Sequence, residues 1–124
     1  MAEAIGIDIV ETSRIDSARR RYGDRFIRRI LGPKEISLYE RRMDKSQFLA
    51  GRFACKEALI KALGHYITKR PSLSSLQILN DKTGRPEVIL PDETREKLKN
   101  VKILVSISHD HTSAVGMAVI SRES

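Results

Sequence analysis

Two carboxylates, Asp8 and Glu57, stand at positions where structure alone would not require a charge. Asp8 interrupts a run that is otherwise apolar or glycine, and an aspartate inside a strand needs a cation or a hydrogen-bonding partner. Together the two carboxylates could hold a hard cation such as Mg2+, which binds carboxylate oxygens along with substrate phosphate. Each also has a structural alternative. Asp8 could be a salt-bridge partner, and Glu57 could be solvated or paired with Lys61 four residues later.

A second group of polar residues lies near the C-terminus, where His109 and His111 form a His-x-His pair. Such a pair could suggest zinc, but a third ligand is hard to find. His65 is the only other histidine, and Cys55 lies among alanines. A loop histidine near basic residues fits a phosphate contact or a proton carrier better, with an exposed histidine of no special role as the alternative.

Two cations lie four residues apart in the segment FLAGRFACKEALIKALG at 48–64. Arg52 and Lys56 would share one face of a helix, and like charges at this spacing repel each other. We therefore expect something negative to lie across them. With Lys61 one turn beyond Glu57, the segment offers cations beside a carboxylate, which suits a metal-bridged polyphosphate.

The pattern of apolar residues indicates which elements position these groups. In 4–10, three isoleucines alternate with Gly6, Asp8 and Val10, which predicts a strand whose other face leaves room at Gly6 for a ligand or another backbone. Alanines recur every four residues along 48–64, so other backbone can pack closely against this long helix, and Gly64 is placed to end it. Shorter helices are predicted before it, and a hairpin and two alternating strands after it. We expect an α+β domain in which the first strand joins an antiparallel sheet around a long central helix.

Length and composition limit the possibilities further. With 124 residues and 40% hydrophobic content, the chain can bury one modest core, so we expect a single domain over 1–124. No apolar run approaches the roughly 20 residues that cross a bilayer. Cys55 is the only cysteine, so no internal disulfide can form, and we interpret it as a small packing residue. We therefore expect a cytoplasmic protein in a reducing compartment, with no membrane association.

The net charge of +7 is concentrated in the first part of the chain. Between residues 12 and 45 there are eleven Lys or Arg and five Asp or Glu. A basic surface of this kind attracts phosphates, nucleic acid, anionic membranes or an acidic protein partner. A well-solvated surface that aids solubility is the alternative.

Three stretches together resemble one family: GIDIVE at 6–11, FLAGRFACKEALIKALG at 48–64 and ISHDHTSA at 107–114. They are similar to the signature blocks of the holo-[acyl carrier protein] synthases, the short bacterial type of 4'-phosphopantetheinyl transferase, in the same order and along the whole chain. The resemblance implies a 4'-phosphopantetheinyl transferase-like fold. It also implies Mg2+-dependent transfer of phosphopantetheine from coenzyme A to a serine hydroxyl of apo acyl carrier protein, with release of adenosine 3',5'-bisphosphate.

The resemblance also implies roles for particular residues. Asp8 and Glu57 would be the metal ligands, and Lys61 and His109 would join them as catalytic residues. The residues expected to bind coenzyme A are Arg52, Lys56, Lys61, Gly64, Arg85, Pro86 and His109. The group that takes the serine proton stays open: we prefer Glu57, or a water held by the metal and a carboxylate, to His109. Asp110 and His111 receive no role.

The basic first part of the chain gains a partner from the resemblance, because acyl carrier proteins are strongly acidic. The residues at matching positions are Arg14, Arg21, Arg25 and Phe26, and Arg28 is a further candidate. Members of this short type are homotrimers with each active site between two subunits, so we expect the same assembly here.

Two other classes compete with this interpretation. A small nucleic-acid-binding protein would explain the arginines, but an aromatic content of 5% leaves few stacking platforms, and such binding does not need Asp8. A metal-dependent phosphohydrolase would use the same carboxylates with water as the nucleophile. We therefore expect no nucleic-acid partner, and product analysis would separate transfer from hydrolysis.

Overall fold

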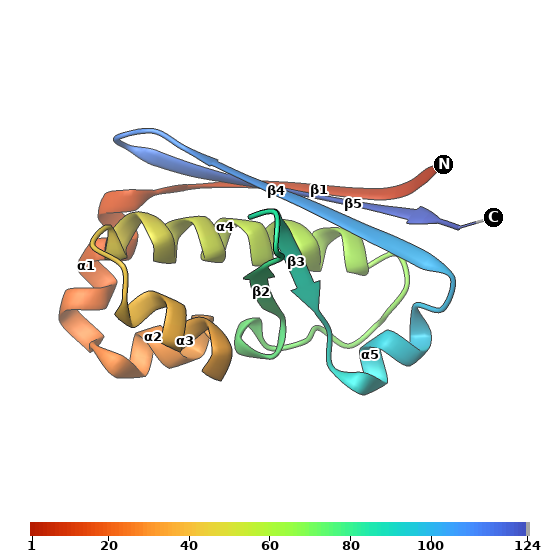
Figure 1. The fold of residues 1–124 in the computed structure, drawn as a ribbon, viewed down its shortest axis with the longest axis horizontal. Helices are drawn as coiled ribbons and strands as arrows, with labels where there is room; N and C mark the ends of the chain where they lie inside the picture. The colour runs from red at the N-terminus through yellow and green to blue at the C-terminus, as the bar shows by residue number, and fades with distance from the viewer. Residues whose placement is uncertain (124) are drawn as a thin grey trace.

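The computed structural model describes residues 1–123 (Figure 1). The elements run in the order β1 (Ala2–Glu11), α1 (Thr12–Tyr22), α2 (Asp24–Ile30), α3 (Pro33–Glu40), α4 (Lys45–Leu63), a 3-10 turn (Leu73–Ser75), β2 (Gln77–Asn80), β3 (Pro86–Ile89), α5 (Asp92–Lys97), β4 (Val101–His109) and β5 (Ser113–Arg122). This is the α+β arrangement that the sequence predicts, with α4 as the long central helix.

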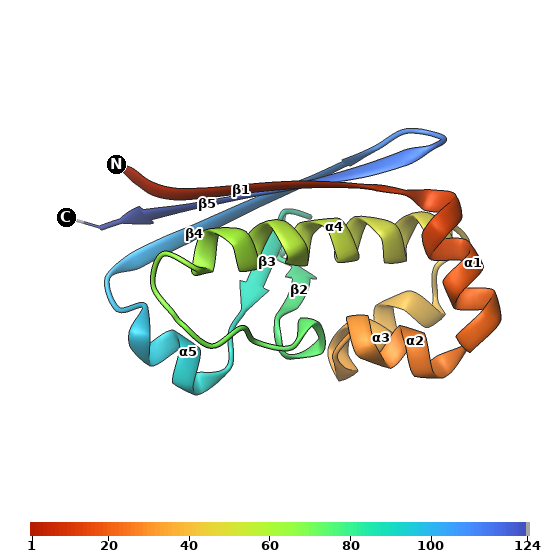
Figure 2. The same ribbon diagram turned by 180° about the vertical axis from the view of Figure 1, so that it is seen from behind.

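The main sheet has the strand order β1-β5-β4, and both pairings are antiparallel. The first strand therefore joins the two C-terminal strands, as expected, and Asp8 of β1 lies opposite Gly116 of β5. β2 and β3 form a separate antiparallel pair. Seen from both sides, the three-stranded sheet runs along one side of α4, while α1 to α3 gather near one end of the molecule and α5 near the other (Figures 1 and 2).

The sheet meets α4 through glycines, which lets the two backbones touch. A Cβ atom added to Gly6 would lie 1.9 Å from the carbonyl oxygen of Ala58, and one added to Gly116 would lie 2.3 Å from the Cα atom of Cys55. Both distances are far shorter than any carbon contact allows. The sequence left open whether a ligand or a backbone approaches Gly6, and the structure shows that it is the backbone of α4.

The opposite face of the sheet carries apolar side chains that remain exposed in the single chain. Ile5, Ile7 and Ile9 are each 60% to 66% exposed, and they pair across to Val119, Met117 and Val115 of β5. On β4, Leu104 continues this row and is also exposed. A contiguous apolar surface of this kind marks an interaction site more often than a solvated surface.

The buried residues form two clusters on α4. One joins α4 to the first three helices through residues such as Ile15, Ile30 and Leu49, and the other joins its second half to the sheet and the hairpin through residues such as Leu63 and Leu76. Every helix within residues 1–123 is too short or too polar to cross a membrane.

Candidate active site

The two predicted metal ligands line the same cavity, which we term the carboxylate cavity. It has a volume of about 460 Å3 and lies between β1, α1, α2 and α4. Its lining residues are Asp8, Ile9, Val10, Arg14, Ile15, Ala18, Phe26, Phe53 and Glu57. The fold thus brings together two carboxylates that are 49 positions apart in the sequence, because β1 and α4 pack side by side.

Each of these carboxylates is paired with a cation in the structure. The ammonium of Lys61 lies 3.1 Å from Oδ1 of Asp8 and also donates a hydrogen bond to the carbonyl of Ile7. The guanidinium of Arg70 donates to Oε1 of Glu57 at 2.8 Å. Lys61 thus lies beside Asp8, and its catalytic role stays a prediction. Sequence reasoning missed Arg70, which lies in a loop 13 residues after its partner.

The donor set suits Mg2+ better than a transition metal. Within residues 1–123 there is no group of three or more His, Cys, Asp or Glu side chains that could hold a metal by themselves. Mg2+ is usually bound by one or two carboxylates, with substrate phosphate and water completing its shell. Asp8 and Glu57 in one cavity match that arrangement.

A second cavity of about 210 Å3 lies on another side of α4, and we term it the histidine cavity. It is lined by Arg42, Asp44, Gln47, Phe48, Gly51, Arg52, Asn80, Pro86, Ile107 and His109. Three residues expected to bind coenzyme A therefore lie together here: Arg52 from α4, Pro86 at the start of β3 and His109 at the end of β4.

Arg52 is only 7% exposed, which is unusual for an arginine. Its Nε donates a hydrogen bond to the carbonyl of Ile78, and its guanidinium carbon lies 4.5 Å from the centre of the Phe48 ring. The buried NH2 group finds no hydrogen-bond partner within residues 1–123. Burial lowers the pKa of Arg52, yet an arginine starts from so high a value that it stays charged. The cavity therefore presents a positive donor suited to an anion.

Lys56 differs from the expectation that it contacts a phosphate. The side chain is fully buried, and its ammonium donates to the carboxylate of Glu35 at 2.6 Å and to the carbonyls of Ile30 and Leu73. A cation with three partners inside the protein cannot reach a ligand without leaving them uncompensated. Burial lowers the pKa of Lys56, and the carboxylate opposes that shift. The negative group that the sequence predicted across Arg52 and Lys56 is thus Glu35 of the chain itself.

The two cavities face different directions. A helix turns by about 100° per residue, so Arg52 and Glu57 project about 140° apart around α4. The lining residues of the two cavities do not overlap within the described part of the chain. The structure therefore brings the predicted site residues together in two groups, not in one.

Two remaining predicted contacts lie outside both groups. Gly64 is exposed at the C-terminal end of α4, as its helix-ending role requires. Arg85 is exposed in the turn between β2 and β3, where its backbone N–H donates to Asp81. Their roles stay predictions.

Two of the five predicted docking residues line the carboxylate cavity, and the other three lie on α1 and α2. Arg14 and Phe26 line it directly, and Arg25 and Phe26 line an adjoining hollow on α1 and α2. Arg21 lies over the ring of Tyr22, and Arg28 borders a further hollow beside Pro33. The basic surface therefore meets the candidate metal site at Arg14 and Phe26.

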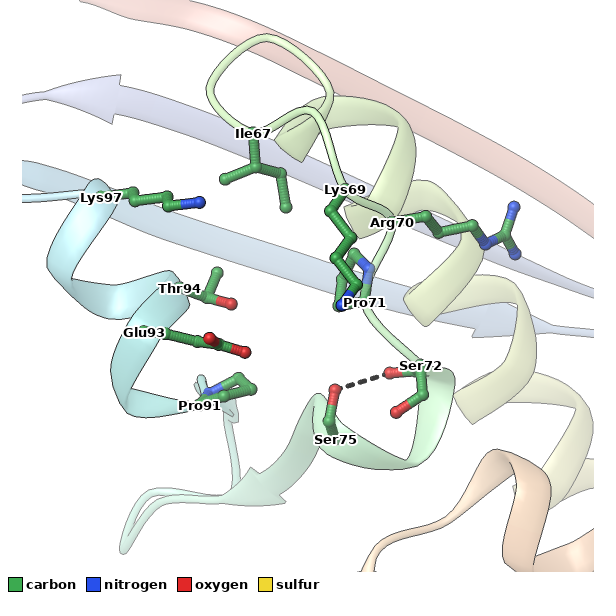
Figure 3. A pocket seen from close by; sticks show the side chains of 10 residues that line it. All are labelled: Ile67, Lys69, Arg70, Pro71, Ser72, Ser75, Pro91, Glu93, Thr94 and Lys97. Carbon is green, nitrogen blue, oxygen red and sulfur yellow. Dashed lines mark hydrogen bonds between the residues drawn. The ribbon is translucent and has the colours of Figure 1, made fainter.

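A third cavity of about 450 Å3 lies between the loop after α4 and α5 (Figure 3). Lys69 and Lys97 border it, together with Ile67 and Pro91. Arg70 extends away from α5 in this view, in keeping with its hydrogen bond to Glu57 (Figure 3). Sequence reasoning missed this cavity, because its two walls come from separate segments, 67–75 and 91–97.

Comparison with known proteins agrees with this fold. The sequence model of the 4'-phosphopantetheinyl transferase superfamily matches residues 4–116. The holo-[acyl-carrier-protein] synthase of Chlorobium limicola is 44% identical over 119 residues, which cover 96% of this chain and 94% of that protein. The crystal structure of the holo-[acyl-carrier-protein] synthase from Neisseria meningitidis aligns with a TM-score of 0.88 at 30% identity, over 98% of this chain and all of that one.

The holo-[acyl-carrier-protein] synthase of Helicobacter pylori, solved in complex with coenzyme A, aligns with a TM-score of 0.81 at 38% identity, over 94% of this chain and 99% of that one. Both the resemblance noted in the sequence and the expected fold class are confirmed. This chain belongs to the 4'-phosphopantetheinyl transferase superfamily, as an enzyme of the holo-[acyl-carrier-protein] synthase family.

Proposed function

We propose that this enzyme transfers the 4'-phosphopantetheine group from coenzyme A to a serine hydroxyl of apo acyl carrier protein and releases adenosine 3',5'-bisphosphate. The observation that carries the proposal is the carboxylate cavity, where Asp8 and Glu57 lie together beside Lys61 and a basic helical surface. The coenzyme A complex of the Helicobacter pylori relative supports coenzyme A as the co-substrate. A cytoplasmic location of the enzyme, which we expect from the sequence, is also part of the proposal.

Asp8 and Glu57 would hold Mg2+, which when bound supplies positive charge against the pyrophosphate. Lys61 already forms an ion pair with Asp8, and its side chain is 55% exposed. Its ammonium can therefore turn to a phosphate oxygen at little cost in free energy. Glu57 lies in the same cavity and is our candidate for taking the serine proton. His109 lines the other cavity, so it could act beside these groups only from a neighbouring copy of the chain.

The histidine cavity would hold the nucleotide end of coenzyme A. Arg52 offers it a buried positive donor, and His109 and Pro86 complete the wall. The two cavities have different lining residues, so one molecule of coenzyme A would meet both most simply where two copies of the chain adjoin. The exposed apolar face of the sheet, formed by Ile5, Ile7 and Ile9, gives such copies a surface to bury. These features support the homotrimer that the resemblance implies.

The basic surface of α1 and α2 would receive the acidic carrier protein. Arg14, Arg21, Arg25 and Arg28 would steer it, and Phe26 would add an apolar contact at the edge of the carboxylate cavity. The serine of the carrier would then be delivered to the cavity that holds Asp8 and Glu57.

The test is the intact mass of an apo acyl carrier protein after incubation with this enzyme, coenzyme A and Mg2+. We expect a gain of one phosphopantetheinyl group, and no gain in a parallel sample with chelator. If several apo carriers gain nothing while free phosphopantetheine accumulates, the enzyme is a hydrolase and the proposal is wrong. If neither occurs but nucleic acid binds equally well to the wild type and to Asp8→Ala, the binding-protein alternative is favoured.

A further inference from the structure

The buried ion pair of Lys56 and Glu35 lies at the centre of a larger hydrogen-bond network. Both side chains are fully buried, with Nζ of Lys56 2.6 Å from Oε1 of Glu35. The same Oε1 accepts a hydrogen bond from the backbone N–H of Gly32. Burying two charges costs several kcal/mol of desolvation per ion, so such a pair is weak evidence for stability alone. The groups that the pair holds in place are therefore more informative than its contribution to stability.

The second carboxylate oxygen of Glu35 leads directly to the histidine cavity. Oε2 accepts a hydrogen bond from the backbone N–H of Ile78 at 3.0 Å, and the carbonyl of the same residue accepts from Nε of Arg52 at 3.1 Å. Ile78 is therefore fixed by Glu35 on one side and fixes Arg52 on the other. Oε2 itself lies 3.9 Å from Nε of Arg52, so the carboxylate also adds a direct attraction.

This network leaves one nitrogen of Arg52 without a hydrogen-bond partner within residues 1–123, and Arg52 lines the histidine cavity. Phe48 supports the guanidinium on one face, Ile78 takes Nε, and NH2 has no partner within residues 1–123. A planar guanidinium that is held in this way needs little further ordering when an anion binds. Glu35 and Lys56 do not line the histidine cavity as the structure describes it, so they would act on a ligand only through Arg52.

We infer that Glu35, with its charge balanced by Lys56, is a positioning residue for nucleotide binding, which it serves by fixing Ile78 and thereby the Arg52 guanidinium at the wall of the histidine cavity. The inference rests on the proposed function in one respect, namely that this cavity takes the nucleotide of coenzyme A. It gives Lys56 a role inside the protein in place of the phosphate contact predicted from its spacing.

The test measures binding of adenosine 3',5'-bisphosphate by calorimetry to the wild type, to Glu35→Gln and to the double variant Glu35→Gln/Lys56→Met. The glutamine can accept through only one oxygen, so it cannot hold both Gly32 and Ile78. The double variant removes both charges, so no uncompensated lysine is left in the core. We expect both to bind the nucleotide at least 10-fold more weakly at a temperature where circular dichroism shows them folded. The KM for coenzyme A should rise more than kcat falls.

Two further variants separate positioning from a general loss of stability. Leu98→Ala destabilises the second core cluster, far from Glu35, and should lower Tm while leaving nucleotide binding unchanged. Arg52→Ala should weaken binding strongly in the wild type and by less than 3-fold in the double variant, because the two changes act through the same guanidinium.

The outcomes distinguish this inference from the proposed function. If the wild type binds the nucleotide and the Glu35 variants bind it equally well, the inference is wrong and the proposed function stands. The inference is also wrong if the effect of Arg52→Ala is the same in both backgrounds. If the wild type does not bind the nucleotide, the proposed function misplaces it and the inference fails with it.

Discussion

Lys61 of the central helix and Asp8 of the edge strand form an ion pair, with 3.1 Å between Nζ and Oδ1. The lysine side chain is 55% exposed, and exposed pairs of this kind contribute about 0–1 kcal/mol to stability. Asp8 can therefore exchange Lys61 for another cation at little cost to the fold. The pair places an ammonium beside the proposed metal ligand before any substrate arrives.

The first prediction concerns Asp8→Asn. The substitution should change the free energy of unfolding by no more than about 1 kcal/mol, because it removes only an exposed ion pair. Mg2+-dependent transfer should fall by about 10²–10³-fold, as when other groups that stabilise transition-state charge are removed. Initial rates at saturating coenzyme A and direct titration with Mn2+ would measure the two effects. Asp92→Asn on α5 is the matched control, and equal rates in both variants would contradict the assignment.

The second prediction concerns the docking surface, through Arg14→Glu. Reversing this charge should raise the KM for the carrier protein by on the order of 10-fold and change kcat much less, because charges of this kind act mainly on encounter. The rate should also become less sensitive to salt. Arg95→Glu on α5 makes the same charge change away from the carboxylate cavity and should have little effect. A KM that rises equally in both variants would indicate a general charge effect and no docking site.

The third prediction concerns the exposed face of the sheet, through Ile7→Asp. An aspartate in the middle of this apolar surface should prevent assembly, so light scattering should report a lower mass than for the wild type. Transfer should fall with it if the active site is completed by a neighbouring copy. Met43→Asp is the control, since Met43 is 99% exposed and lies outside the sheet. A wild type that is monomeric and active would contradict the proposed homotrimer.

The fourth prediction concerns Cys55, for which burial raises the pKa of the thiol to about 12. At pH 8 the folded protein would hold about one thiolate in 10⁴ molecules, so iodoacetamide should label Cys55 only after unfolding in urea. The raised pKa also means that the unfolded chain loses this proton first. Stability should therefore fall as the pH rises from about 8.5, the pKa of an unfolded cysteine, toward 12. Cys55→Ala should lack this part of the alkaline destabilisation, and labelling of the native wild type at pH 8 would refute the assignment.

The local elements could be predicted from the sequence because their signals are local. Alternation in 4–10 indicated β1, and Gly64 marked the end of α4. The location of Asp8 and Glu57 at one site could also be predicted, because each residue lies in a recognisable motif. Lys61 followed from the same motif.

The sequence could not show which face of β1 or of α4 is directed toward the core and which toward solvent or a ligand. The isoleucines of β1 are exposed in the single chain, because alternation shows that a strand has two faces and does not say which one meets the helix. Lys56 was expected at a ligand for a related reason. The spacing of Arg52 and Lys56 predicted a negative group across them. It could not show that this group would be Glu35, which lies 21 residues before Lys56. Arg70 is a further long-range partner of this kind, joined to Glu57 by a loop without a motif.

The glycine contacts between the sheet and α4 have a consequence for which positions can mutate. Gly116 lies opposite Asp8 in the sheet and against Cys55, two residues before Glu57, so its missing side chain sets the spacing between the two carboxylates. An alanine there would push β5 away from α4 and would separate the proposed metal ligands, Asp8 and Glu57, without contacting either. The least replaceable positions of this enzyme therefore include one that carries no functional group at all, and a survey of tolerated substitutions should find Gly116 as intolerant as Asp8.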